Sequence, residues 1–171
     1  MSEPNVFYYE TEIEWTKEKE GRIKGPILPA VSVGAPPEFN GREGQWTPEH
    51  LFVASINTCF MLTLLAIAEH SKLPLVSFSS TAKGKLEKVP GSGYQITEII
   101  VKPRVVIASV EDLGRIGRVL EKAKENCFIS NSIKSTVKLE PQIYQRQTQT
   151  SPCPLGEASE SASRSLDSEK H

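Results

Sequence analysis

The sequence of 171 residues has few cysteines and no excess of charge of either sign. Its three cysteines, at positions 59, 127 and 153, are too few and too far apart for the disulfide framework of a small secreted protein. They form no Cys-x-x-Cys pair and no Cys/His pairing at zinc-ligand spacing, so we expect no metal site. The 20 basic and 21 acidic residues give a net charge of −1, which argues against non-specific nucleic-acid binding.

Two further signals are missing. The first residues, MSEPNVFYYE, contain no basic region followed by an apolar run, so no secretory signal is expected. The glycine-rich stretch GAPPEFNGREG, residues 34–44, lacks the GK[ST] of phosphate-binding loops, and no cofactor is expected. A chain of this length suits one domain with a real core, and we expect it in the cytoplasm.

The most apolar stretch covers residues 47–70 and reads TPEHLFVASINTCFMLTLLAIAEH. Thr47 is a good helix N-cap, and Pro48 suits the first helical position, where its missing N–H costs nothing. No charged residue occurs between positions 51 and 68, so the predicted helix is apolar on every face and must be buried. Its length approaches that of a membrane span. Four polar side chains inside it, and the absence of a basic flank, favour a central core helix and no membrane.

Shorter patterns surround this helix. Residues 6–16 alternate in polarity and predict a strand, followed by a polar turn over residues 17–21 and a returning strand over residues 27–33. Residues 77–88 and 94–107 also alternate, on either side of the turn sequence PGSG, and predict a β-hairpin.

A second helix is predicted to open at Ser109, which forms a capping-box-like pattern with Asp112. Apolar residues three or four positions apart place Cys127 on the buried face of this helix, near its C-terminal end. Residues 128–134 predict a turn or short helix, and residues 136–144 a last strand.

The remaining residues, 145–171, are rich in Ser, Gln, Glu and Pro and predict a disordered tail in which Cys153 is incidental. Strands, a long helix, a hairpin, a helix and a strand together predict an α+β fold, with helices packed on antiparallel sheet, in one domain over residues 1–144.

Cys59 and Cys127 have two interpretations. Free cysteine is among the most buried residue types and packs like a small hydrophobic side chain. Alternatively, the two form a redox pair where the helices meet. A thiolate is the nucleophile, so the attacking cysteine needs a nearby cation or hydrogen-bond donor. A cysteine at a helix C-terminus meets the negative end of the dipole and stays protonated, which suits Cys127 as a resolving thiol better than as an attacking one.

Glu49, the second residue of the long helix, also has two interpretations. Its carboxylate complements the helix dipole in the first turn, or it orients an arginine by paired hydrogen bonds. Ten residues separate it from Cys59, a rise of about 15 Å along one helix, so the two side chains cannot touch. If both serve one site, loops or a second chain must bridge this gap.

Two motifs resemble those of a known family. TPEHLFVASINTCFMLTLLAIA, residues 47–68, resembles the Pro-Glu-x-Leu…Ala-x-x-x-Cys-Phe signature of the OsmC/Ohr family of thiol peroxidases, and KAKENCFISNSIK, residues 122–134, resembles its second motif, Cys-x-Ile-Ser. The resemblance covers about residues 6–144. It implies an OsmC-like fold with antiparallel sheets wrapped around two central helices in an intertwined homodimer, and active sites at the subunit interface.

The resemblance also implies a mechanism in oxidative-stress defence. Cys59 attacks an organic hydroperoxide, with hydrogen peroxide as a further substrate, and becomes a sulfenic acid with which Cys127 condenses to a disulfide. A dithiol reductant, lipoyl-type in family members, resets the pair. The Glu at position 49 would hold an arginine, either Arg22 or Arg42, and the short loop after Arg42 favours Arg22.

Apolar residues beside the thiols favour alkyl or fatty-acyl peroxides: Phe60, Met61, Phe128 and Ile129. At position 128 many members have Pro. Two alternatives stay open at this stage. One is a non-catalytic protein that holds a lipid-like ligand, and the other is a redox sensor.

Overall fold

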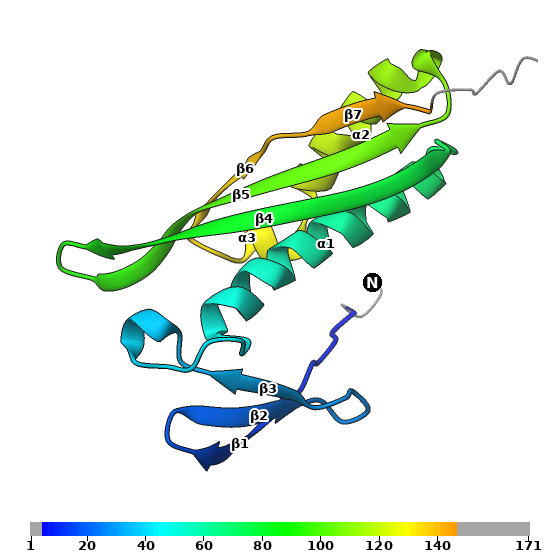
Figure 1. The fold of residues 1–171 in the computed structure, drawn as a ribbon. Helices are drawn as coiled ribbons and strands as arrows, with labels where there is room; N and C mark the ends of the chain where they lie inside the picture. Colours follow the sequence, from blue (N-terminus) through cyan, green and yellow to red (C-terminus); the bar gives the residue numbers. More distant parts are fainter. Residues whose placement is uncertain (1–4, 147–171) are drawn as a thin grey trace, which may run out of the picture.

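The computed structural model describes residues 5–146 (Figure 1). Three strands come first: β1 (Glu12–Lys17), β2 (Glu20–Lys24) and β3 (Val31–Gly34). A short 3-10 turn, η1 (Pro37–Phe39), leads to the long helix α1 (Pro48–His70). The second half contains β4 (Leu75–Val89), β5 (Gly93–Ile107), the 3-10 turn η2 (Val110–Asp112), α2 (Leu113–Glu125), α3 (Phe128–Asn131), β6 (Thr136–Leu139) and β7 (Gln142–Gln145). The predicted tail lies outside the described residues from position 147 on.

The long helix forms as its sequence predicts. Thr47 is the N-cap, and its side chain accepts a hydrogen bond from the backbone N–H of His50 at 3.3 Å. Pro48 occupies the first turn, where no N–H is needed. By length and composition alone α1 could cross a membrane, a test that core helices of soluble proteins also pass.

One face of α1 packs into the core, and the opposite face does not. The buried side chains recur every fourth residue: Ile56, Phe60, Leu64 and Ala68. On the other side Leu62 is 57% exposed and Leu65 39% exposed. The expectation of a helix buried on every face is therefore not met within one chain.

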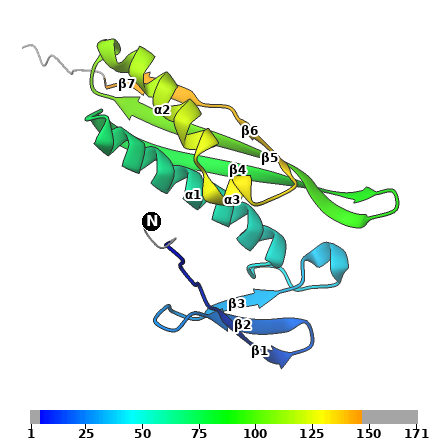
Figure 2. The same cartoon turned by 180° about the vertical axis from the view of Figure 1, so that it is seen from behind.

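The large sheet carries both helices on one face (Figures 1 and 2). β4 and β5 form the predicted antiparallel hairpin, and β4 is one edge of the sheet. Alternate residues of β5 point into the core and are fully buried against the helices: Ile99, Val101, Val105 and Ile107.

The last strand differs from the prediction in two ways. It is divided into β6 and β7, because Glu140 and Pro141 fall between them and proline has no N–H to give to a ladder. Both pieces pair parallel with β5, through Ile99 with Val137 and Val105 with Ile143. Helix α2 carries the chain back along the sheet, and such a crossover returns the next strand parallel to the last. The α+β class is confirmed, but the large sheet is mixed, not antiparallel.

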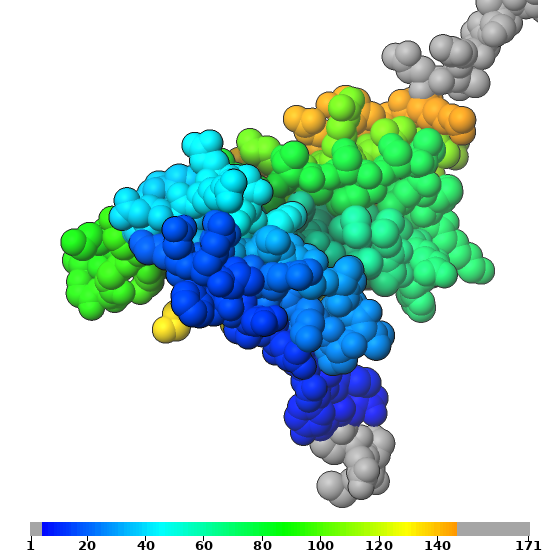
Figure 3. Space-filling view, turned by 60° about the horizontal axis from the view of Figure 1, so that its bottom comes forward, coloured from blue at the N-terminus to red at the C-terminus, as the bar shows by residue number. Residues whose placement is uncertain are grey.

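The N-terminal sheet is a separate small layer beside the start of α1, coloured blue in Figure 3. Its order is β1-β2-β3, all antiparallel. The predicted first strand begins later than expected, at Glu12, and the predicted polar turn over residues 17–21 was wrong in part. The chain reverses at Glu18, whose φ is 45°, and β2 starts at Glu20.

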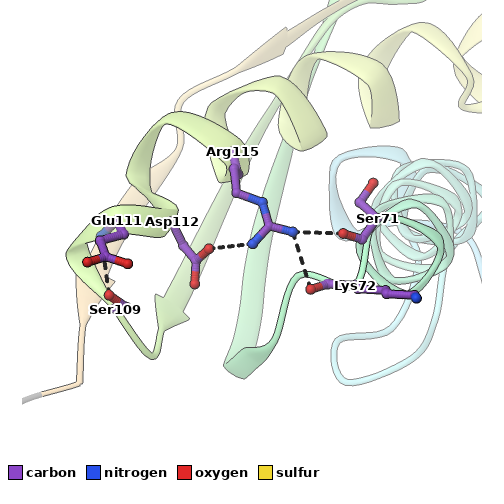
Figure 4. Close-up of polar contacts among 6 residues, drawn as sticks. All are labelled: Ser71, Lys72, Ser109, Glu111, Asp112 and Arg115. Atoms are coloured by element: carbon purple, nitrogen blue, oxygen red, sulfur yellow. Dashed lines mark hydrogen bonds and ion pairs between the residues drawn. The ribbon is translucent and has the colours of Figure 1, made fainter.

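Arg115 joins the start of α2 to the end of α1 (Figure 4). Its Nη1 donates to Oδ1 of Asp112 at 2.7 Å. Its Nη2 donates to the carbonyl oxygen of Ser71 at 2.7 Å and to that of Lys72 at 3.2 Å. These bonds satisfy carbonyls at the helix C-terminus and fix where α2 lies along α1.

The predicted capping at Ser109 occurs in a modified form. Ser109 accepts a hydrogen bond from the N–H of Glu111 at 3.3 Å and opens η2, not α2 itself. Asp112 is the N-cap residue of α2 but makes no side-chain cap bond, because its carboxylate binds Arg115 instead.

Candidate active site

The two cysteines that the sequence singles out come together in the structure. Cys59 lies in the middle of α1 and is half-buried, and Cys127 is 1% exposed. Both thiols are free, and each is close enough to the other to shift its pKa: Cys127 lowers that of Cys59, and Cys59 raises that of Cys127. Cys127 does not lie within the second helix as predicted: α2 ends at Glu125, and Cys127 is the N-cap residue of α3. Its predicted burial is confirmed.

The surroundings of Cys59 favour its thiolate. Burial raises the pKa of the thiol, but hydrogen bonds to its sulfur outweigh that effect and lower the pKa from its ordinary value. The donors are, in order of effect, the backbone N–H of Ile129, the Cys127 thiol, the Thr63 hydroxyl and the backbone N–H of Phe128. Cys59 therefore has the stabilising donors that an attacking cysteine requires, and within residues 5–146 no cation is among the causes of its shift.

The surroundings of Cys127 favour its thiol. Burial is the main reason that its pKa is raised, and the neighbouring Cys59 raises it further. The Ser130 hydroxyl, which donates to Sγ of Cys127 at 3.1 Å, partly offsets this effect, as does the backbone N–H of Ser130. The raised pKa has the direction that the sequence predicts, but burial is its main cause, and not the dipole of the preceding helix.

A pH titration checks this assignment of the two thiols. Because the pKa of Cys59 is lowered, its alkylation by iodoacetamide is expected to reach half its maximal rate at a lower pH in the folded protein than in the urea-unfolded chain, where a thiol titrates near about 8.5. Reactivity is lost as the pH falls through the folded-state pKa. Mass spectrometry of the Cys59 peptide gives the rate at each pH. Equal midpoints in the two states would contradict the assignment.

Glu49 is far from the thiols along α1, as its spacing predicts. It borders two cavities of about 720 and 510 Å³ between the first half of α1 and the far end of the β4–β5 hairpin. Its Oε2 atom is buried and has no hydrogen-bond partner. Oδ1 of Asn57, which borders the larger cavity, is also buried and unpaired. Glu49 as a whole is partly exposed, so the orphaned group is this one carboxylate oxygen.

Neither candidate arginine reaches Glu49 within the single chain. Arg22 lies on β2 with an exposed side chain, next to Gly21 and Ile23, which face the opposite way toward the start of α1. Arg42 is exposed and lies 4.0 Å from Glu20. The structure thus brings Cys59 and Cys127 together and leaves Glu49 and both arginines apart.

Sequence reasoning missed the donors to the thiols. Thr63 lies four residues after Cys59 and hence on the same helix face, which was a usable signal. Ser130 lies three residues after Cys127, but its contact depends on the turn between α2 and α3, which the residue pattern does not specify.

The fold and this thiol pair define a class: an α+β protein with two free, contacting cysteines where two helices pack. The sequence matches the OsmC-like protein family over residues 41–142, and the chain belongs to this family. The resemblance seen in the two cysteine motifs is thereby confirmed.

Three relatives of known sequence bear on function. The chain is 26% identical to the uncharacterized protein YmaD of Bacillus subtilis over 138 residues, which are 78% of this chain and 90% of that one. It is 29% identical to peroxiredoxin OsmC of Escherichia coli over 117 residues, 68% of this chain and 80% of the relative. It is 28% identical to the organic hydroperoxide resistance protein of Xanthomonas axonopodis pv. citri over 142 residues, 80% of this chain and 95% of the relative.

A solved structure supports the fold. An OsmC-like protein of unknown function from Vibrio cholerae superimposes with a TM-score of 0.74 at 23% identity, covering 80% of this chain and all of the other. Relatives named for peroxidase activity and hydroperoxide resistance place such activity at the level of the family.

Proposed function

We propose that the protein is a cysteine-based peroxidase that reduces organic hydroperoxides. The observation that carries the proposal is the proximity of Cys59 and Cys127 in one core cluster, where the pKa of Cys59 is lowered and that of Cys127 is raised. This asymmetry is what a pair made of an attacking and a resolving thiol requires. The names of two relatives support the same activity.

The proposed reaction has two steps on the protein. The Cys59 thiolate attacks the outer oxygen of the hydroperoxide, the O–O bond breaks, and the leaving alkoxide takes a proton to become an alcohol. Cys59 is then a sulfenic acid. Cys127 attacks the sulfur of Cys59, the S–O bond breaks, and hydroxide leaves with the thiol proton as water. The product is a Cys59–Cys127 disulfide.

A dithiol must then reduce this disulfide by thiol exchange, and a lipoyl-type dithiol is the proposed reductant. Such reducing conditions fit the proposed location in the cytoplasm. Phe128 is 78% exposed beside the site, and Ile129 adjoins it. These apolar side chains favour alkyl or fatty-acyl hydroperoxides as substrates over polar ones, with hydrogen peroxide as a lesser substrate.

The active unit in this proposal is a homodimer. One face of α1 exposes apolar side chains that a second copy would bury. The Oε2 atom of Glu49 has no hydrogen-bond donor within the described residues. A second copy of the chain would bury this face of α1, and it would also supply the donor if one of its arginines reaches Glu49. We keep Arg22 as the first candidate and Arg42 as the second, and the domain responsible is the stretch of residues 1–144.

Substitution of the two arginines separates these candidates. Replacing the arginine that pairs with Glu49 leaves the buried Oε2 atom of Glu49 unpaired, so we expect a loss of peroxidase kcat/KM of about tenfold or more. The other alanine variant serves as the matched control and should keep its activity. Steady-state kinetics of Arg22→Ala and Arg42→Ala give the comparison. Full activity in both variants would exclude an arginine partner at either position.

The proposed function itself is tested by stoichiometric oxidation. Reduced protein receives one equivalent of cumene hydroperoxide, free thiols are blocked with an alkylating agent, and linkages are mapped by mass spectrometry. A fast Cys59–Cys127 disulfide supports the peroxidase. Two free thiols after prolonged exposure would overturn it in favour of a lipid-binding protein. A disulfide that forms without saturable turnover would indicate a redox sensor.

A further inference from the structure

Cys127 is the less solvent-exposed of the two reacting cysteines. It is 1% exposed, so water does not solvate a thiolate at this position. A buried anion without hydrogen-bond donors is strongly disfavoured. Yet the second step of the proposed reaction needs Cys127 to lose its proton and attack Cys59. Some group of the protein must therefore stabilise the negative charge on this sulfur.

The part of the chain that the structure describes offers two donors to Sγ of Cys127, and both belong to one residue. The Ser130 hydroxyl donates at 3.1 Å, and the backbone N–H of Ser130 adds a second bond. The serine is itself half-buried. The side chains of β5 that face the helices are apolar and have no donor to give: Ile99, Val101, Val105 and Ile107.

The charged groups nearby do not take this role. Cys59 faces Cys127 from α1, and its thiolate disfavours a second negative charge. The charged residues at the end of α2 are exposed to solvent, where their effect is screened: Lys122, Lys124 and Glu125. Ser130 is left as the side chain that acts directly on the resolving sulfur.

We propose that Ser130 activates the resolving thiol: its hydroxyl stabilises the Cys127 thiolate while that thiolate attacks the sulfenic acid of Cys59. The inference rests on the proposed function. In the resting protein the same hydroxyl, the Cys127 thiol and the Cys59 sulfur form a chain of donors in which each bond strengthens the next. After the first step the Cys59 sulfur is no longer an anion, and the Ser130 bond serves Cys127 alone.

The variant Ser130→Ala removes this bond. A hydrogen bond to a charged group makes about a tenfold difference in the acid dissociation of its partner, so the thiolate fraction of Cys127 at neutral pH should fall about tenfold. The more basic thiolate is a better nucleophile, which returns about a threefold gain. The disulfide-forming step should thus slow about threefold at neutral pH, its pH midpoint should rise by about one pH unit, and its alkaline plateau should not fall.

Two measurements test the inference. First, the thiolate of Cys127 is titrated by its ultraviolet absorbance in a Cys59→Ser, Cys153→Ser background, with and without Ser130→Ala. Second, rapid mixing of the full chain with cumene hydroperoxide separates sulfenic acid formation, trapped with dimedone, from disulfide formation. Sulfenic acid formation should change less than disulfide formation, because Ser130 acts on Cys59 only through the Cys127 thiol.

The chain provides matched controls. Ser132 is the C-cap residue of α3 and donates to the carbonyl of Phe128 at 2.8 Å, so Ser132→Ala tests the loss of a serine that donates to neither thiol. Ser130→Thr keeps the hydroxyl and should restore the midpoint. A purely structural role predicts a lower plateau with an unmoved midpoint.

The outcomes distinguish this inference from the proposed function. A rapid disulfide in the wild-type chain together with an unmoved Cys127 midpoint in Ser130→Ala overturns the role of Ser130 and leaves the peroxidase standing. A wild-type chain that forms no disulfide overturns both. A raised midpoint with an intact plateau, rescued by Ser130→Thr, supports both.

Discussion

Replacing Cys59 with serine is expected to abolish the consumption of organic hydroperoxide. The Cys59 thiolate is the nucleophile that attacks the peroxide, and its donors would stabilise a serine alkoxide far too little at neutral pH. Turnover should fall by at least about a thousandfold, the scale on which loss of a nucleophile acts. The measurement is peroxide consumption with a dithiol reductant present.

Cys127→Ser should behave differently from Cys59→Ser. Its Cys59 still reacts once with peroxide, gives a sulfenic acid that dimedone traps, and then stalls unless an added thiol replaces the resolving cysteine. Cys153→Ser is the matched control, a cysteine outside the described residues that should be dispensable. Equal and full activity in the Cys59 and Cys127 variants would refute the mechanism.

Leu62→Glu is expected to convert the proposed homodimer to a monomer. Leu62 is 57% exposed on the face of α1 opposite the core, within the stretch of residues 51–68 that has no charge. Burying an unpaired carboxylate there against a second copy costs several kcal/mol, so self-association should weaken by at least about a hundredfold. Size-exclusion chromatography with light scattering gives the mass.

Leu62→Met is the matched control for this change. It keeps an apolar side chain of similar volume and should leave the dimer intact. A dimer that persists in Leu62→Glu would place the interface elsewhere, and a wild-type monomer would remove the need for a second copy. Peroxidase activity measured on the same samples tests whether Glu49 needs its donor from the partner.

The sequence was informative where a pattern was long. Residues 47–70 have an N-cap, a proline at the first position and an uninterrupted apolar run, and the helix has the predicted bounds almost to the residue. The hairpin followed from two alternating stretches around PGSG. β2 was missed because it is five residues long and mixes glycine with charges, so no alternation stands out.

Such residue patterns do not predict which distant segments pair with each other. Alternation in residues 136–144 predicts a strand but says nothing of its direction, which depends on how α2 crosses the sheet. Similarly, Cys59 and Cys127 were identified by residue type and predicted face, whereas the pKa of each depends on donors set by the turn after α2. The arginine that would pair with Glu49 could not be identified for a related reason, since no contact within one chain joins Glu49 to Arg22 or Arg42.

The position of β4 at the sheet edge has a consequence for aggregation. A strand of 15 residues with a free edge is a template onto which any extended chain can add. This edge carries exposed lysines at positions 83, 85 and 88, and its pairing with β5 is irregular at two points. Like charges repel when two such edges approach, and a bulged strand does not stack in register. These features protect the edge of a newly synthesised chain against fibril growth.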